Sequence, residues 1–404
     1  MNELLLIKFF LNKDIYTRYR HLVGNELVQG DALILLTLLD DWFISNEKPI
    51  SLDDLYFLAL TRFTREQADL LFQSLRALEP SETITTFLED LNKKHLLEQI
   101  SLASYEAANG KNVTHKLHDL FDQLGNVKVE DKECFIDSDL SEILDDTVKE
   151  PGLRWRLKTL NRMLGSLRAG DFGFFVARPE TGKTTMLASE VSFMAEQLRE
   201  DQGPILWFNN EEQGKKVKLR VYQAALGSSL SDLLKDPRSA DSKYLELTHG
   251  KIKIYDNAVT HKKVVESLSK KYKPSLIIFD QIDKVQGFTS DREDLRLGAI
   301  YQWARELAKT HNCPVIGVSQ AAGEAEDTQW LNMGHVSNSK TAKQAEADWI
   351  VGIGKLEDPS YNKVRYISVM KNKLMGDSDT EPVLRHGKME VIIEPQIARY
   401  LDIT

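Results

Sequence analysis

The chain has 404 residues, of which 42% are hydrophobic and 28% are charged, and its formal net charge at pH 7 is -9. This composition is typical of a globular protein with roughly two or three domains, so it excludes a fibrous or a wholly disordered chain. The negative charge excludes attraction of nucleic acid to the whole surface, because phosphate affinity depends on Lys and Arg.

The sequence also disfavours membrane attachment and a structural zinc site. No stretch approaches the ~18 uninterrupted apolar residues of a membrane span. The two cysteines, Cys134 and Cys313, lie far apart, and only Cys313 has a histidine nearby, His311. A structural zinc takes about four ligands, so two are too few. We therefore predict a cytoplasmic protein with reduced thiols and no membrane partner.

Residues 1–130 carry apolar residues at three- and four-residue spacing, for example in 33–43 and 52–60, as helices do. They contain no metal-ligand set, no nucleophile arrangement and no glycine-rich loop. We predict a small α-helical N-terminal domain at 1–130 without an activity of its own.

Residues 131–152 form a predicted linker, in which residues 131–150 hold eight acidic residues and two lysines. Five apolar residues nevertheless fall on one helical face: Ile136, Leu140, Ile143, Leu144 and Val148. An amphipathic linker helix has no core of its own, so we expect its apolar stripe to dock on another surface. Packing on its own chain and docking on another subunit both stay open.

From residue 153 to 404 short apolar runs alternate with amphipathic helical patterns. The strand-like runs are 172–176, 205–208, 276–279 and 315–318, and the clearest helical patterns are 186–198 and 295–310. This alternation predicts an α/β domain with a mainly parallel sheet and helices on both faces. Later runs at 349–353, 366–370 and 391–393 would extend the sheet or form a hairpin beside it.

The segment from Ala177 to Thr184 reads Ala-Arg-Pro-Glu-Thr-Gly-Lys-Thr and joins a predicted strand to a predicted helix. Such a phosphate-binding loop holds phosphates with backbone N–H groups and the helix N-terminus, while Lys183 reaches the outer phosphates and Thr184 ligates Mg²⁺. We predict ATP as the ligand. The predicted nucleotide-binding residues are Arg178, Pro179, Glu180, Thr181, Gly182, Lys183, Thr184 and Thr185.

Three polar residues follow the neighbouring strand-like runs. Asp280 ends a buried run at the edge where open α/β sheets bind ligands, so we predict that it holds Mg²⁺ together with Thr184. Glu211 follows the 205–208 run and is predicted to activate water, with Glu212 as the competitor. Gln320 follows the 315–318 run, where a neutral amide is placed to sense the outer phosphate. Turn or surface roles stay the alternative for each residue alone.

These motifs together resemble the helicase domain of the DnaB family, including its bacteriophage replicative members. The resemblance covers about residues 150–375, and the family often has Ala-Arg-Pro where other phosphate loops have glycine, which fits Ala177. The matching features, in the family's order, are Leu167–Asp171, the loop 177–185, Glu211, the strand ending at Asp280, Ser319-Gln320 and Asp348-Trp349.

The resemblance implies a RecA-like ATPase domain, a ring of six subunits with ATP at each interface, and single-stranded DNA in the centre. It also implies a basic residue supplied by the neighbouring subunit, which stabilises charge on the transferred phosphoryl group. The matching residues are Lys371 and Lys373, and Lys373 stands where the family usually has arginine. Because lysine lacks the planar fork of arginine, either both lysines act together or the finger lies elsewhere, for example at Arg365.

Two loops correspond to the family's DNA-facing loops, residues 284–294 and 321–341. The second loop begins with acidic residues, which are unfavourable near DNA phosphates. We therefore expect the DNA contact in its later half, where side chains and N–H groups suit phosphate binding. The predicted DNA-binding residues are His335, Asn338, Ser339 and Lys340.

We predict a replicative DNA helicase of bacteriophage type that acts in the cytoplasm of the bacterial host. It would be a homohexamer that couples ATP hydrolysis to movement on single-stranded DNA, in the family's 5′ to 3′ direction, with primase, a helicase loader and a polymerase as candidate partners. One alternative is a RecA-like recombinase or recombination mediator. Another is a non-hydrolysing ring subunit or helicase loader.

Overall fold

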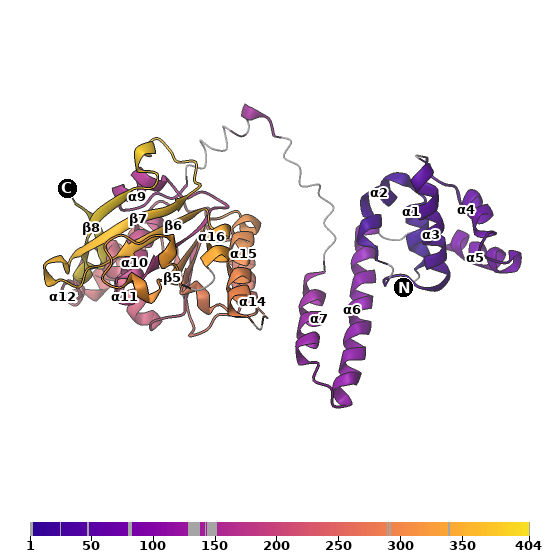
Figure 1. The fold of residues 1–404 in the computed structure, drawn as a ribbon, viewed down its shortest axis with the longest axis horizontal. Helices are drawn as coiled ribbons and strands as arrows, with labels where there is room; N and C mark the ends of the chain where they lie inside the picture. The colour runs from indigo at the N-terminus through magenta and orange to yellow at the C-terminus, as the bar shows by residue number, and fades with distance from the viewer. Residues whose placement is uncertain are drawn as a thin grey trace. The chain divides into compact units, whose positions relative to one another are not determined.

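The computed structural model describes residues 3–24, 26–46, 48–79, 83–127, 138–141, 143, 152–288, 290, 292–337 and 340–403. The chain divides into two compact units, Met1–Asp137 and Ser138–Thr404 (Figure 1). The predicted domain limits at 130 and 152 stay predictions. Of the five apolar residues of the predicted linker helix, Leu140 and Ile143 lie within the described residues, and both side chains are exposed.

The N-terminal unit is helical, as predicted. Several helices begin at polar side chains that accept backbone N–H groups, namely Asn12, Ser51 and Thr64, which compensates for the missing bonds of a first turn. The apolar faces of the helices form one core. The helices are α1 (Leu4–Phe10), α2 (Lys13–Tyr19), α3 (Gly30–Ser45), α4 (Leu52–Ala59), α5 (Arg65–Ala77), α6 (Ile84–Ala108) and α7 (Thr114–Asn126).

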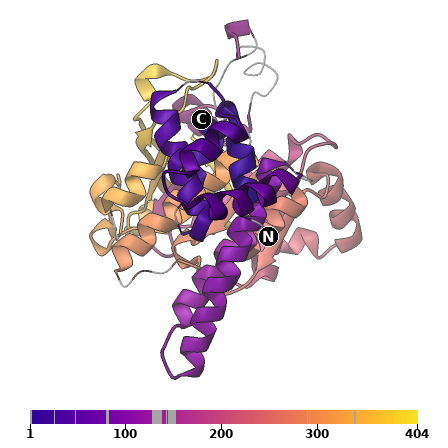
Figure 2. The ribbon, with the colours of Figure 1, turned by 90° about the vertical axis from the view of Figure 1, so that its right-hand side faces the viewer.

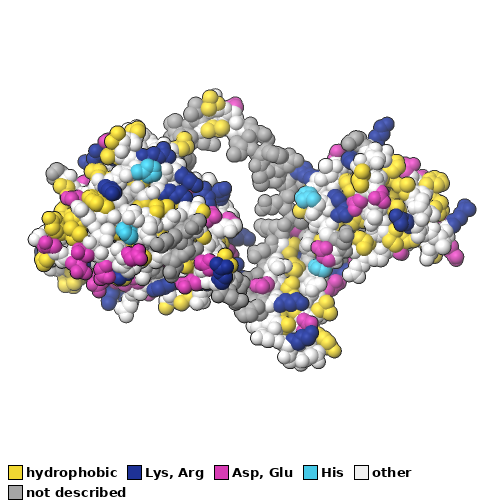
Figure 3. Space-filling model, in the orientation of Figure 1, with side chains coloured by type: hydrophobic (Ala, Val, Ile, Leu, Met, Phe, Trp, Pro, Cys, Tyr) yellow, Lys and Arg dark blue, Asp and Glu magenta, His cyan; other side chains and the backbone are white. Residues whose placement is uncertain are grey.

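Helices α6 and α7 form a hairpin that extends beyond α1–α5 (Figures 1 and 2). The main core of this unit ends at Leu91, so the outer half of α6 packs mainly against α7. Apolar side chains reach the surface along the hairpin, where Figure 3 shows them in yellow; they include Leu97, Leu102, Tyr105 and Phe121.

One nine-stranded sheet forms the centre of the C-terminal unit, in the order β3-β2-β4-β5-β1-β6-β7-β8-β9. The first six strands in this order run parallel, and β7, β8 and β9 are added antiparallel. The strands are β1 (Phe172–Ala177), β2 (Ile205–Asn209), β3 (Ile252–Asp256), β4 (Leu276–Asp280), β5 (Val315–Gln320), β6 (Trp349–Gly354), β7 (Val364–Asn372), β8 (Lys388–Glu394) and β9 (Arg399–Asp402). The predicted mainly parallel sheet is confirmed, and the later runs extend it.

Helices cover both faces of the sheet. Successive residues of a strand point to opposite faces, so in β1 Phe175 belongs to one buried cluster while Phe174 belongs to the other. Helices α9, α10, α11 and α13 contribute to the first cluster, and α14 and α15 contribute to the second. The helices are α9 (Lys158–Leu164), α10 (Lys183–Glu196), α11 (Gly214–Leu226), α12 (Leu230–Leu233), α13 (Pro237–Thr248), α14 (Lys262–Tyr272), α15 (Glu293–His311) and α16 (Lys340–Glu346). Among the described helices, none is long and apolar enough to cross a membrane.

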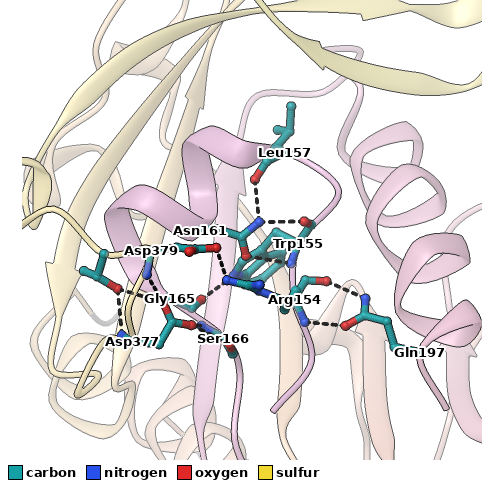
Figure 4. Close-up of polar contacts among 10 residues, drawn as sticks. Arg154, Trp155, Leu157, Asn161, Gly165, Ser166, Gln197, Asp377 and Asp379 are labelled. Atoms are coloured by element: carbon teal, nitrogen blue, oxygen red, sulfur yellow. Dashed lines mark hydrogen bonds and ion pairs between the residues drawn. The ribbon is translucent and has the colours of Figure 1, made fainter. Parts of the chain in front are cut away.

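The segment that leads into β1 is fixed by side-chain hydrogen bonds (Figure 4). Asn161 accepts the backbone N–H of Trp155 at 3.0 Å and donates to the Trp155 carbonyl at 2.8 Å. The Ser166 hydroxyl donates to Asp377 at 2.6 Å. Asp377 lies in the loop that follows β7, so this hydrogen bond holds that loop against the segment before β1.

Candidate nucleotide-binding site

The predicted phosphate loop joins the end of β1 to the first turn of α10. Glu180 (φ 58°) and Gly182 (φ 105°) have left-handed backbone conformations. A Cβ at Gly182 would lie 2.6 Å from Ile393 Cδ1 and 2.9 Å from the Tyr400 hydroxyl, so only glycine fits there. The N–H groups of a first helical turn have no partner within the helix, and the loop therefore presents them to an anion.

Two side chains from the antiparallel strands hold this loop in place. Arg365 Nε donates to the Thr181 carbonyl at 2.7 Å, and the Tyr400 hydroxyl donates to the Thr181 and Gly182 carbonyls at 3.3 Å each. Arg365 is buried, and its contacts are with its own chain. It is thus placed to support its own phosphate loop rather than to reach a neighbouring subunit.

Lys183, Thr184 and Asp280 meet at the carboxyl ends of the parallel strands. The Lys183 ammonium donates to the Arg178 carbonyl at 3.1 Å, and the Thr184 hydroxyl donates to Asp280 Oδ2 at 3.1 Å. All three predicted site residues are buried. Burial lowers the pKa of Lys183, and the carboxylates of Glu211 and Asp280 oppose that effect. The fold therefore brings residues 96 positions apart into one polar cluster.

Asp280 has an oxygen available for a cation. Its Oδ1 is buried and lacks a hydrogen-bond partner among the described residues, and burial followed by the charge of Glu211 raises the pKa of Asp280 to about 7. Mg²⁺ prefers oxygen ligands and usually takes one or two carboxylates plus phosphates. Within the described part of the chain no group of three His, Cys, Asp or Glu could hold a metal. The residues present therefore fit Mg²⁺ held by Thr184 and Asp280 together with a bound triphosphate.

The two candidate bases have different surroundings. The charges of Glu211 and Glu212 both act on Asp280, and that of Glu211 acts on Lys183 as well, so Glu211 is the more closely linked to this cluster. Glu212 instead forms an ion pair with Arg220 of α11 at 2.9 Å. The geometry favours Glu211 over Glu212 as the carboxylate that meets the outer phosphate.

Gln281, a residue that sequence reasoning missed, holds Glu211. Its side-chain amide donates to Glu211 Oε2 at 2.9 Å. Gln281 is buried and has a left-handed φ of 70°, a conformation that is unfavourable for a residue with a side chain. The sequence could have indicated Gln281 because it directly follows Asp280, and the first residue beyond a buried parallel strand lies at the edge of the sheet where ligands bind.

Gln320 lies at the same edge of the sheet as the phosphate loop. It ends β5 and is paired in register with Ala177, the last residue of β1. Its carbonyl accepts the Ser337 hydroxyl at 2.6 Å, which ties it to the end of the following loop. Gln320 is therefore placed between the phosphate loop and the predicted DNA loop.

Lys371 and Lys373, the two lysines predicted to complete the site of a neighbouring subunit, lie at the end of β7 and differ in exposure. Lys371 is half-buried and its ammonium donates to the carbonyls of Gln344 and, at 3.2 Å, Ala345. Burial and the neighbouring Lys373 lower the pKa of Lys371. The Lys373 side chain is exposed. Lys373 is thus the more accessible of the two.

Of the predicted DNA-binding residues, His335 has a described side chain. It is half-buried, and its Nδ1 accepts the backbone N–H of Asn332 at 3.1 Å. Asn338 and Ser339 lie outside the described residues, as does the side chain of Lys340, whose backbone begins α16.

A cleft of about 230 Å³ adjoins the phosphate loop. Arg178 and Thr181 line it on the loop side, and Glu326 and Lys355 line it from the segments after β5 and β6. Arg178 and Glu326 form an ion pair at 3.3 Å. The cleft leaves room beside the loop for a ligand larger than a phosphate group.

Comparison with known proteins adds a family model and two solved structures. A model described as an AAA domain matches residues 138–326. No curated protein matches the chain closely enough to count as a relative.

A solved structure described as an ATPase domain superposes with a TM-score of 0.54 at 15% identity, covering 68% of this chain and all of its own. A structure of a DnaB-like replicative helicase and its interactions with primase covers 100% of this chain and 99% of its own, with a TM-score of 0.55 at 13% identity. The chain shares the fold of DnaB-like replicative helicases. This DnaB-like fold confirms the predicted fold class, a mainly parallel sheet with helices on both faces and a helical region before it.

Proposed function

We propose that this chain is a replicative DNA helicase that hydrolyses ATP to move along single-stranded DNA and unwind duplex DNA. The observation that carries the proposal is the buried cluster of Lys183, Thr184 and Asp280, with Glu211 beside it, at the ligand edge of a DnaB-like fold. Burying a lysine beside a carboxylate with one unpartnered oxygen, Asp280 Oδ1, is costly, and a bound nucleotide with Mg²⁺ would compensate for that cost.

Each residue of the cluster has a distinct part in hydrolysis. The loop N–H groups and Lys183 bind and orient the outer phosphates, and Glu211, held by Gln281, accepts a proton from the attacking water. Gln320 senses whether the outer phosphate is present and transmits that state to the following loop. Mg²⁺, when bound to Thr184 and Asp280, supplies positive charge that neutralises the phosphates.

We further propose a homohexamer in which a neighbouring subunit completes each site. Lys373 is exposed at the end of β7, so it can approach the phosphates of an adjacent subunit, with Lys371 behind it. Single-stranded DNA would contact the segment after β5, including His335, Asn338, Ser339 and Lys340. One of the similar structures concerns a helicase with primase, which supports primase as a partner; 5′ to 3′ movement, a loader and a polymerase belong to the same proposal.

The decisive test is turnover and unwinding by the full chain with Lys183 replaced by Ala. We expect the variant to lower ATP hydrolysis by about 10²- to 10³-fold, as the loss of one preorganised stabilising group does, and to abolish unwinding of a forked DNA duplex. Lys309→Ala, an exposed lysine near the end of α15, is the matched control and should unwind normally.

The same experiment separates the alternatives. Equal and low turnover in the wild type and Lys183→Ala would indicate a non-hydrolysing ring subunit or loader. Turnover without unwinding, together with filaments rather than rings on DNA in the electron microscope, would indicate a recombinase or mediator. Either result would overturn the helicase proposal.

The linker gives a separate prediction about assembly. Leu140 is 70% exposed, and removing this apolar surface from water by packing it against another surface would lower the free energy of the protein. If that surface belongs to the adjacent subunit, Leu140→Asp should convert hexamers to smaller species on a sizing column. Ser141→Asp, at an exposed neighbour, is the matched control. An unchanged hexamer in the Leu140 variant would contradict docking through this face.

A further inference from the structure

Helix α16 carries a lysine that is fully buried and paired. Lys343 has no exposed surface, and its ammonium donates to Asp283 Oδ2 at 2.9 Å and to the Ser319 hydroxyl oxygen at 3.2 Å. The ammonium also lies 5.3 Å from the centre of the Tyr301 ring. Burying an ammonium is strongly unfavourable unless it is paired and hydrogen-bonded, so Lys343 fixes the position of α16 on these partners.

The partners of Lys343 are themselves linked. The Ser319 hydroxyl donates to Asp283 Oδ2 at 2.8 Å, and the Tyr301 hydroxyl donates to Asp283 Oδ1 at 3.0 Å. Asp283 therefore accepts from three side chains that come from β5, α15 and α16. Replacing buried polar groups with apolar ones is often neutral for stability, so a network of this kind points to a positional role.

This network borders the hydrolysis residues. Ser319 directly precedes Gln320 in β5, and Asp283 lies in the short 3-10 helix η2 (Ile282–Lys284) that directly follows Gln281. Gln281 is the residue that holds Glu211. A shift of Lys343 would thus act on the backbone next to Gln320 and Gln281 at once.

The other side of α16 is tied to the segment after β5 and to β7. The Gln344 side chain donates to the Met333 carbonyl at 2.8 Å, and Met333 begins the short helix η4 (Met333–His335) of the predicted DNA loop. The carbonyls of Gln344 and Ala345 accept the Lys371 ammonium. Three consecutive residues, Lys343 to Ala345, therefore contact three different functional regions.

We propose that α16 is a positioning element through which DNA bound at the segment after β5 sets the geometry of the hydrolysis residues, with the Lys343–Asp283 pair as its link to the nucleotide site. This inference rests on the proposed helicase function and names the regulation of that same site. Lys343 and Asp283 touch neither nucleotide nor DNA in this assignment; they act through Gln320, Gln281 and Glu211.

The test compares ATP turnover of the full chain with and without single-stranded DNA. Lys343→Met keeps most of the length of the side chain and removes its charge, while Asp283 retains the Ser319 and Tyr301 hydroxyls as donors. We expect the stimulation of kcat by DNA to fall by about 5- to 100-fold, the usual range for coupling between two sites. The basal kcat and the KM for ATP should stay close to those of the wild type, and Lys309→Met is the matched control.

Two further variants separate positioning from folding. Asp283→Asn leaves the ammonium buried without a carboxylate and should lower the melting temperature, whereas the double variant Asp283→Asn with Lys343→Met should recover it without recovering DNA stimulation. Gln344→Ala removes the tie to Met333 without exposing a buried charge and should also lower stimulation.

Retention of wild-type stimulation by the double variant and by Gln344→Ala would overturn the inference while leaving the helicase proposal intact. A wild-type protein without ATP turnover or without any response to DNA would instead overturn the proposed function. Equal losses of basal and stimulated kcat in every variant would mean that the network only maintains the fold, and would also overturn the inference.

Discussion

Glu211→Gln is expected to lower the kcat for ATP hydrolysis by about 10²- to 10⁴-fold, the contribution of a positioned general base. The substitution keeps the shape of the side chain and an oxygen for the Gln281 amide, which donates to Glu211 Oε2 at 2.9 Å. It removes the carboxylate that can accept a proton from water. Steady-state ATP turnover measures the loss, and titration with a fluorescent ATP analogue should show that nucleotide binding remains.

Glu212→Gln is the matched control, since it makes the same chemical change one residue away. Glu212 pairs with Arg220, and both side chains are about one third exposed, so loss of this partly solvated pair should have little effect. Normal turnover in the Glu211 variant and strong loss in the Glu212 variant would reverse the assignment of the base.

How far the sheet could be predicted depended on the burial of each strand. The central strands β1, β2 and β4 are buried along their whole length, so they read as continuous apolar runs and were predicted. Strand β3 lies at the edge of the sheet and is mostly half-exposed, with Lys253 inside it. An edge strand with one solvated face lacks that continuous signal, so β3 was missed.

The residues of the site likewise divide into those that the sequence could predict and those that it could not. Lys183 could be predicted because it ends the phosphate loop that follows β1, and Asp280 because it ends β4. Both strands have a clear apolar pattern, and parallel strands end at a common edge. The supports of the loop could not be predicted in this way. Arg365 contacts Thr181 across 184 positions, and that contact depends on β7 joining the sheet beyond β6, which local patterns do not specify.

The buried pair of α16 was missed for a related reason. Lys343 lies in a segment that reads as polar, which normally indicates a solvated helix. Its burial follows from the packing of α16 against α15 and β5, where Asp283 supplies the compensating charge. Sequence patterns identify charges but not the partner that allows a charge to be buried.

Asp280 gives the site a pH dependence with a definite sign. Because burial raises the pKa of Asp280 from 3.8 to about 7, the folded metal-free protein keeps a proton between these pH values that the unfolded chain has released. The free energy of unfolding contributed by this group therefore falls as pH rises from about 4 to about 7 and stays low above that. Mg²⁺ must displace this proton, so the affinity for Mg²⁺ with nucleotide should weaken by about tenfold for each pH unit below the pKa.

Asp280→Asn is therefore expected to have opposite effects on stability and on activity. Without metal or nucleotide at pH 8 the variant should melt at a higher temperature than the wild type, because it removes a buried charge; a change of roughly 2–4 °C accompanies each kcal/mol in a unit of this size. Near pH 4 the difference should shrink, since the buried carboxyl of the folded wild type is then protonated and carries no charge. ATP turnover should be lost, and Mg²⁺ with ATP should no longer raise the melting temperature of the variant. Calorimetric melting at both pH values, with and without Mg²⁺ and ATP, measures the effects on stability, and steady-state ATP turnover measures the effect on activity.

A variant that is less stable than the wild type at pH 8, or that is still stabilised by Mg²⁺ with ATP, would show that Asp280 is a structural carboxylate rather than the metal-binding group of the site.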